Sequence, residues 1–163
     1  MTGLFCGSFC PITKGHMDTI TRASKLCDTL YVVVANNVDK KYAIDIDDRC
    51  ELARLATRHL ENVKVVKYEG LIADFCKTNG VGLIIKSGRN ALDLQYEMDM
   101  ADVNKDMCGV ETVYFAGNKQ YQSISSSLVR ELATANVDIT PYVPSGLAPI
   151  IMQLFAKNQS KTK

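Results

Sequence analysis

Residues 7–16 combine side chains and spacings that suit the binding of phosphate groups. The stretch follows an apolar run and precedes a helical pattern, which is where α/β folds bind nucleotides. Gly7 and Gly15 let the backbone approach a ligand closely, and Pro11 stiffens the turn between them. His16 and the N–H groups at the start of the next helix can face an anion. The stretch therefore predicts a binding site for the phosphates of a nucleotide.

A second segment of similar chemistry, residues 123–132, lies near the other end of the chain and begins with several serines. Ser125 can cap the helix that follows while a neighbouring hydroxyl contacts a phosphate, so the capping and binding roles are compatible. Between the two segments, Lys40 follows an expected strand and is a candidate ligand for an anion. Lys41 beside it is expected to be an exposed neighbour.

Apolar runs of strand length alternate with helical patterns along the chain. The expected strands are residues 4–6, 30–35, 63–66, 83–85 and 112–115. Continuous apolar strands separated by helices indicate a parallel sheet that is covered on both faces. We therefore predict an α/β fold with a doubly wound, five-stranded parallel sheet, in which residues 1–163 form a single domain.

The expected helices follow these strands in turn. The first begins after the stretch that ends at His16, with Met17, Ile20, Ala23 and Cys27 on one face. The others are expected at 46–57 after an Asp45 cap, 71–78, about 93–107 with an apolar stripe, 126–133 after the Ser125 cap, and about 147–157. Residues 158–163 are expected to form a frayed tail.

The two phosphate-binding segments are predicted to meet. In sheets of this type, ligands bind beyond the carboxyl ends of the strands, where the strand order reverses. The first segment follows the first expected strand, and the second follows the fifth. Two helix N-termini can therefore converge on one crevice, although the sequence alone leaves that convergence open.

Composition excludes several classes of partner. The chain has 163 residues, 19 of them basic and 18 acidic, for a net charge of +1, which gives no electrostatic footprint for nucleic acid or an anionic membrane. No apolar run approaches the ~18 residues expected of a membrane span, so a cytoplasmic protein is expected. The six cysteines are spread singly, without the spacing of a zinc site, and are expected to be reduced thiols.

Thr13-Lys14-Gly15-His16 resembles the (T/H)xGH signature of the nucleotidyltransferase superfamily. Residues 123–132 are similar to the form of its second block found in bacterial phosphopantetheine adenylyltransferases, and the resemblance covers about residues 3–145. It implies transfer of AMP from ATP to 4′-phosphopantetheine, which yields dephospho-coenzyme A and pyrophosphate. It also implies a shared crevice for both segments, Mg²⁺ that arrives with ATP, and a homohexamer.

The resemblance also assigns site residues. It implies catalytic roles for His16, Lys40, Arg89 and Ser126, with His16 donating a hydrogen bond to the α-phosphate in the transition state. Its ATP-binding set is Ser8, Phe9, His16, Ser87, Gly88, Arg89, Glu97, Tyr121, Gln122, Ser123, Ile124, Ser125, Ser126 and Ser127. Its acceptor-binding set is Ser8, Lys40, Ile72 and Lys86, and it implies no protein metal site. An enzyme nucleophile is unnecessary, because a phosphate monoester is already largely ionised at neutral pH.

Two positions depart from the family pattern. Cys10 replaces an aspartate that could orient the glycine turn by accepting backbone hydrogen bonds, unless the thiol packs against Phe9 or Pro11 instead. Lys86 replaces an arginine, which keeps the charge but loses the planar fork that suits phosphate. The loop at 87–91 also differs from the common G-L-R-A-V.

Two other interpretations stay open at this point. One is an adenylyl- or cytidylyltransferase that acts on a different acceptor, such as nicotinamide or nicotinate mononucleotide. The other is a catalytically silent nucleotide-binding module, which the departures at Cys10 and Lys86 suggest.

Overall fold

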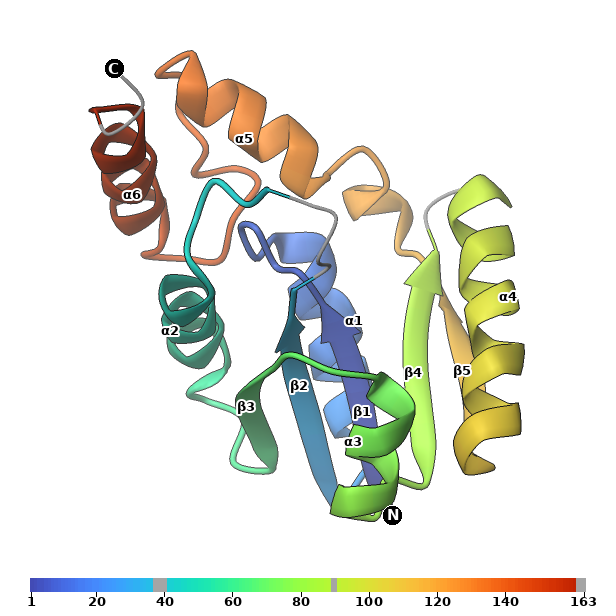
Figure 1. The fold of residues 1–163 in the computed structure, drawn as a ribbon. Coiled ribbons are helices and arrows are strands. Elements are labelled where there is room, and N and C mark those ends of the chain that lie inside the picture. The colour runs from blue at the N-terminus through green and yellow to red at the C-terminus, as the bar shows by residue number, and fades with distance from the viewer. Residues whose placement is uncertain (37–40, 89–90, 161–163) are drawn as a thin grey trace.

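The computed structural model describes residues 1–36, 41–88 and 91–160 and contains one parallel sheet (Figure 1). Its strands are β1 (Thr2–Gly7), β2 (Thr29–Ala35), β3 (Val63–Tyr68), β4 (Leu83–Gly88) and β5 (Glu111–Ala116). They pair in the order β3-β2-β1-β4-β5, with every pairing parallel. The predicted α/β fold with a five-stranded parallel sheet is confirmed.

Helices cover both faces of this sheet. They are α1 (Lys14–Ser24), α2 (Ile46–Thr57), α3 (Ile72–Asn79), α4 (Ala91–Cys108), α5 (Ser126–Thr134) and α6 (Ala148–Ser160), with a short 3₁₀ helix, η1 (Lys119–Tyr121). Figure 1 shows α3 and α4 on one side of the sheet and α1 on the other. The doubly wound arrangement accounts for the continuous apolar strands, since neither face is left to solvent.

Adjacent residues of a strand enter different hydrophobic cores. Leu4 and Ile84 belong to a smaller cluster under α3, whereas Phe5 and Ile85 belong to the larger cluster shared with α1, α2, α5 and α6. Side chains that alternate across a strand produce this division. The larger core lies below the segments that carry both predicted phosphate-binding sites.

The strand order reverses at β1, which pairs with β2 on one edge and with β4 on the other. The chain therefore winds outward through β2 and β3, then crosses back to β4 and β5. The turn after β1 and the segments after β4 and β5 all leave the carboxyl edge of the sheet. This is the edge at which a doubly wound sheet binds its ligands.

Several helix ends differ from the sequence predictions. Helix α1 ends at Ser24, so Cys27 lies beyond it, although its thiol is still buried. Asp45 occupies the N-cap position of α2 without a side-chain capping bond. Helix α6 continues through Ser160, so residues 158–160 are helical rather than frayed, and Asn158 Nδ2 donates to Ala43 O at 2.6 Å. Residues 161–163 lie outside the described part of the chain.

The apolar stripe that was predicted on α4 faces solvent for much of its length. Met100, Val103 and Met107 are all exposed. Among the described helices, none is long and apolar enough to cross a membrane.

Candidate active site

A cleft of about 720 Å³ opens at the carboxyl edge of the sheet. It is lined by residues of the turn after β1, the end of β4, helix α4 and the segment that leads into α5. The predicted site residues that line it are Ser8, His16, Lys86, Ser87, Gly88, Glu97, Tyr121, Gln122, Ile124, Ser125, Ser126 and Ser127. The two phosphate-binding segments therefore converge, and the chemical roles of these residues stay predictions.

Three other predicted site residues lie away from the lining. The Phe9 side chain is buried in the larger core, and Ser123 is exposed. Ile72 packs against the smaller core at the start of α3. Lys40 and Arg89 lie outside the described residues, so their predicted roles are untested.

His16 is held by the start of its own helix. Thr13 is the N-cap of α1, its hydroxyl accepts from the His16 N–H at 3.4 Å, and the Thr13 N–H donates to His16 Nδ1 at 3.0 Å. This reciprocal pair is a capping box, which satisfies two backbone donors at the helix start. The His16 ring also meets the Phe9 ring edge-on, with centroids 5.0 Å apart.

The capping box determines which nitrogen of His16 carries the proton. Because the Thr13 amide donates to Nδ1, that nitrogen is an acceptor in the neutral ring, and we assign the proton to Nε2 from this hydrogen bond. His16 itself lines the cleft. A motif used for helix capping thus also orients a hydrogen-bond donor.

The second segment is tied directly to the first. Ser125 caps α5 by accepting from the Leu128 N–H at 3.0 Å, as predicted. Ser126 Oγ donates to the carbonyl of Pro11 at 2.8 Å. Arg130 Nη1 donates to the carbonyl of Cys10 at 2.7 Å. Side chains of α5 therefore hold the turn after β1 in place.

Arg130 is a cleft residue that the predicted set missed. Besides the Cys10 carbonyl, its guanidinium donates to Ser127 Oγ at 2.9 Å. Its position three residues after Ser127 places both on one face of α5, and this spacing could have suggested the contact. Its contact with the Cys10 carbonyl, on the turn after β1, forms only in the tertiary fold.

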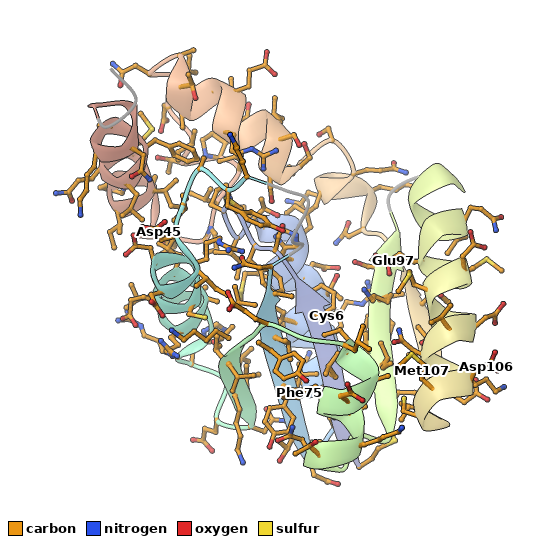
Figure 2. The ribbon with its side chains drawn as sticks, in the orientation of Figure 1. Cys6, Asp45, Phe75, Glu97, Asp106 and Met107 are labelled. Carbon is orange, nitrogen blue, oxygen red and sulfur yellow. The ribbon has the colours of Figure 1, made fainter. Side chains whose placement is uncertain are left out.

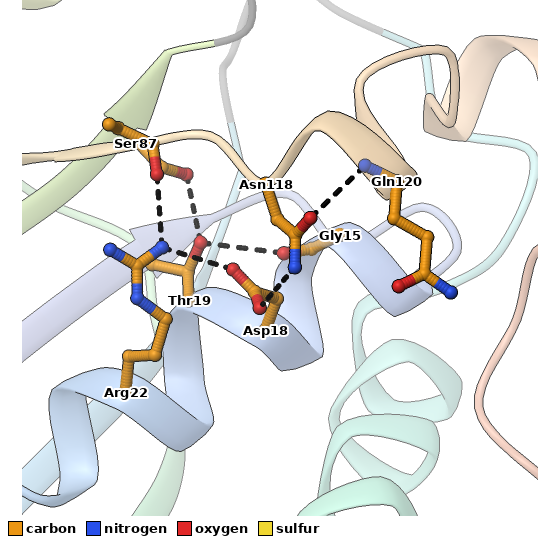
Figure 3. A network of polar contacts seen from close by, with 8 residues as sticks. Gly15, Asp18, Thr19, Arg22, Ser87, Asn118 and Gln120 are labelled. Atoms are coloured by element: carbon orange, nitrogen blue, oxygen red, sulfur yellow. Dashed lines mark hydrogen bonds and ion pairs between the residues drawn. The ribbon is translucent and has the colours of Figure 1, made fainter.

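A polar network joins α1 to β4 and β5 (Figure 3). The hydroxyl of Thr19 hydrogen-bonds to Ser87 Oγ at 3.0 Å, which links α1 to the end of β4. The carboxylate of Asp18 pairs with Arg22 at 3.1 Å and accepts from Asn118 at 3.4 Å. Asp18, Thr19 and Asn118 all line the cleft, and sequence analysis singled out none of them.

Lys86 and Glu97 form an ion pair on the opposite side of the cleft, with Nζ and Oε2 2.8 Å apart. Their side chains are 16% and 24% exposed, and Figure 2 shows Glu97 on the side of α4 that faces the sheet. Burial disfavours the Lys86 ammonium, but Cys6 and Glu97 beside it more than compensate, so the pKa of Lys86 is raised. Residues predicted to bind different substrates therefore contact each other.

The turn after β1 has an unusual backbone at Phe9, whose φ is 45°. This left-handed conformation is rare for a bulky residue and costs about 1–3 kcal/mol, so the surroundings must enforce it. The Cys10 side chain is 2% exposed and belongs to the same buried cluster as Phe9. The thiol thus packs into the core beside Phe9, in agreement with the alternative that it packs against Phe9 or Pro11.

The cleft as a whole suits a polyphosphate. Two helix N-termini, several serine hydroxyls, an imidazole N–H and the Lys86 cation line one space, and each favours an anion. Within the described residues, no group of three or more His, Cys, Asp or Glu side chains is arranged to hold a metal ion.

Comparisons with known proteins agree with this chemistry. A family model described as cytidylyltransferase-like matches residues 4–132. The phosphopantetheine adenylyltransferase of Thermobifida fusca is 39% identical over 156 residues, which cover 93% of this chain and 95% of that protein. The one from Streptomyces coelicolor is 42% identical over 147 residues, or 90% of each chain.

The fold is also found in a solved structure from Vibrio parahaemolyticus that is provisionally assigned as a nicotinate-nucleotide adenylyltransferase. It is 15% identical, with a TM-score of 0.68 over 96% of this chain and 91% of that one, which shows a shared fold. The sequence match to these two relatives extends over at least 90% of the chain. The chain belongs to the phosphopantetheine adenylyltransferase family.

Proposed function

We propose that the protein transfers AMP from ATP to 4′-phosphopantetheine and releases pyrophosphate. The observation that carries this proposal is the joining of two phosphate-binding segments in one cleft, through the Ser126 and Arg130 bonds to the turn after β1. Relatives named phosphopantetheine adenylyltransferase match almost the entire chain. The activity is the adenylating step of coenzyme A synthesis.

The proposed reaction is a direct displacement at the α-phosphorus of ATP. An oxygen of the acceptor phosphate forms the new bond to phosphorus, while the bond from the α-phosphorus to the bridging oxygen breaks and pyrophosphate leaves. The acceptor oxygen is already ionised at neutral pH, so the protein needs neither a nucleophile nor a strong general base. Catalysis then depends on positioning and on stabilising charge at the transferred phosphate.

We assign this charge stabilisation first to His16. The capping box contacts Nδ1 and so assigns the proton of the neutral ring to Nε2. We assign Ser126, Ser127 and the N-terminus of α5 to the departing pyrophosphate, because they line the cleft and the helix dipole favours negative charge there. Tyr121, Gln122, Ser123 and Ile124 are assigned to the nucleoside end by family resemblance.

We assign acceptor binding to Lys86 and Ser8, which both line the cleft. Lys40 and Ile72 complete the set by family resemblance, and Lys41, the next residue in the sequence after Lys40, lines the cleft. Since Glu97 already pairs with Lys86, an acceptor phosphate must share this cation with a carboxylate. We expect acceptor affinity to be sensitive to that competition.

We propose that magnesium enters as a complex with ATP. The described residues offer no cluster of three ligands, and Mg²⁺ is usually held by substrate phosphates and water with few protein carboxylates. The bound ion would neutralise part of the triphosphate charge. His16 and the serines of α5 would still provide the protein's own contacts to the phosphates.

The decisive experiment measures pyrophosphate release with ATP, Mg²⁺ and each candidate acceptor in turn. We expect release with phosphopantetheine and a product with the mass of dephospho-coenzyme A. Preferential use of nicotinamide or nicotinate mononucleotide, or of CTP in place of ATP, would move the chain to another branch of the superfamily. Nucleotide binding without release for any acceptor would identify a silent module.

We further propose that the chain is a single domain that assembles as a homohexamer. One sheet carries all the described helices, and α4 exposes several apolar side chains that a second copy could cover: Leu94, Met98, Met100, Val103 and Met107. Sedimentation equilibrium would measure the assembly. The six free cysteines suit a reducing compartment, which supports placing the enzyme in the cytoplasm.

A further inference from the structure

Arg49 is a buried cation that the mechanism described above does not use. It lies on α2 with only 1% of its surface exposed, and it does not line the cleft. The ion pairs found among the described residues do not include it. Burying a guanidinium without a carboxylate partner is costly, so its hydrogen bonds must serve to hold something else in place.

Its partners are neutral oxygens from three separate segments. Nε donates to Ile44 O at 3.0 Å, Nη1 donates to Ser8 O at 2.7 Å and to Ala35 O at 3.3 Å, and Nη2 donates to Asn36 Oδ1. These oxygens belong to the turn after β1, the end of β2 and the segment before α2. The planar guanidinium presents its donors in fixed directions, so one side chain sets the relative positions of all three segments.

The bond to Ser8 determines how the next amide points. In a trans peptide the carbonyl and the following N–H point in opposite directions, and the bond from Ser8 to Phe9 is not among the cis bonds of the chain. Arg49 holds the Ser8 carbonyl toward the protein interior, while Ser8 itself lines the cleft. The Phe9 N–H is therefore directed away from Arg49.

Arg49 also supports the wall that follows β2. The centre of its guanidinium lies 4.2 Å from the centroid of the Tyr42 ring, in the geometry of a cation–π contact. Tyr42 and its neighbours Lys41 and Ala43 line the cleft. The same buried side chain thus contacts two cleft walls that come from different strands.

We propose that Arg49 is a positioning residue, which orients the Phe9 N–H and the Tyr42 segment before substrates bind. This inference rests on the proposed function, because the oriented amide would receive charge at the phosphates of ATP. Arg49 touches no substrate and acts through Ser8 and Tyr42. A preorganised donor of this kind contributes mainly to kcat, since it is set for the transition state in advance.

The test compares Arg49→Lys and Arg49→Met with the parent protein. The lysine variant keeps the charge and loses the fork, and the methionine variant loses both. For a misplaced donor we expect kcat to fall about tenfold in Arg49→Lys and about a hundredfold in Arg49→Met, while KM for ATP rises only about threefold.

Two controls separate positioning from loss of stability. Leu52→Ala removes a buried side chain from the same helix and should lower the thermal midpoint while the folded protein keeps its kcat. Arg54→Met removes an exposed arginine of α2 and should leave kcat unchanged. A folded Arg49→Met protein with parental kcat would overturn the proposal. Parental kcat in Arg49→Lys would do the same, because charge alone would then suffice.

If Arg49→Met does not fold, Arg49→Lys decides the question. If the parent protein makes no dephospho-coenzyme A, the proposed function fails by itself. The positioning role is then measured by calorimetric titration with ATP. We expect Arg49→Lys to bind ATP about threefold more weakly than the parent and Arg54→Met to bind it equally well, whereas equal affinity in Arg49→Lys would refute the role.

Discussion

The two sides of the cleft are built in different ways. We call residues 7–16 with residues 123–130 the signature wall, and residues 86–88 with Glu97 the β4–α4 wall. The signature wall is held by helix caps and by side chains that bind backbone carbonyls, as in the Ser126 bond to Pro11. The β4–α4 wall is held by the Lys86–Glu97 ion pair and the Thr19–Ser87 bond.

This contrast suggests a division of labour. The donors of the signature wall are fixed before any ligand arrives, so they can act on charge that develops in the transition state. The cation of the β4–α4 wall is already paired, and a substrate phosphate must compete for it. We therefore expect changes in the signature wall to affect kcat, and changes in the β4–α4 wall to affect KM for the acceptor.

The largest effect should come from the signature wall. His16→Ala removes the Nε2–H donor, and we expect kcat to fall by about a hundredfold or more. Thr13→Ala is the matched control, because it removes the N-cap hydroxyl and keeps the imidazole, at a cost of about 1 kcal/mol in stability. Steady-state rates and thermal unfolding would measure both. Equal losses of kcat in the two variants would mean that His16 matters only as a cap.

A smaller effect on a different parameter is expected from the β4–α4 wall. Lys86→Met removes the cation and leaves Glu97 facing the acceptor phosphate, so we expect KM for phosphopantetheine to rise about tenfold with little change in kcat. Lys86→Arg should keep KM close to the parent value or lower it, since a guanidinium can bind the carboxylate and a phosphate together.

Lys105→Met is the control for Lys86, because it breaks another lysine–glutamate pair, with Glu111, that is exposed and outside the cleft. Its KM values should match those of the parent. If Lys86→Met lowered kcat and left KM unchanged, the proposed division between the two walls would be wrong.

The smallest effect concerns Cys10 and sharpens the account of the signature wall. Because its side chain is buried, and Arg49, Ser126 and Arg130 already hold the turn, we expect Cys10→Ser to change kcat/KM by no more than about twofold. Cys10→Asp buries a carboxylate and should lower the free energy of unfolding by about 1–3 kcal/mol. Chemical denaturation measures this cost. Unchanged stability would show that the turn still offers the aspartate its hydrogen bonds.

The parts of the molecule that the sequence predicts well depend on local chemistry. Strand positions, the parallel sheet and the caps at Thr13 and Ser125 follow from residues close to one another in the chain. A cap contact spans only a few residues, so its partners can be identified in the sequence. The convergence of the two phosphate-binding segments on one cleft was also predicted, but that prediction depended on the expected fold and the family resemblance together.

The parts that escaped prediction require contacts between distant segments. Arg49 lies in α2 and Ser8 in the turn after β1, so the two residues are far apart in the chain. A lone arginine in a helical sequence pattern also gives no sign that its side chain is buried. The Lys86–Glu97 pair joins β4 to α4, and Asn158 near the end of α6 donates to the distant Ala43 carbonyl. Such pairings appear only when the chain is folded, because either partner alone resembles an ordinary surface residue.

The placement of the cysteines gives this chain an internal reporter for chemical labelling. Cys6 lines the cleft and is half-buried, whereas Cys108, also half-buried, lies at the end of α4, outside the cleft. The other thiols are buried, and burial together with the neighbouring Cys108 and Cys6 raises the pKa of Cys76 to about 12. A small alkylating reagent should therefore modify Cys6 and Cys108 first. Occupancy of the cleft would then shield Cys6 alone, with Cys108 as the reference peptide in the same mass spectrum.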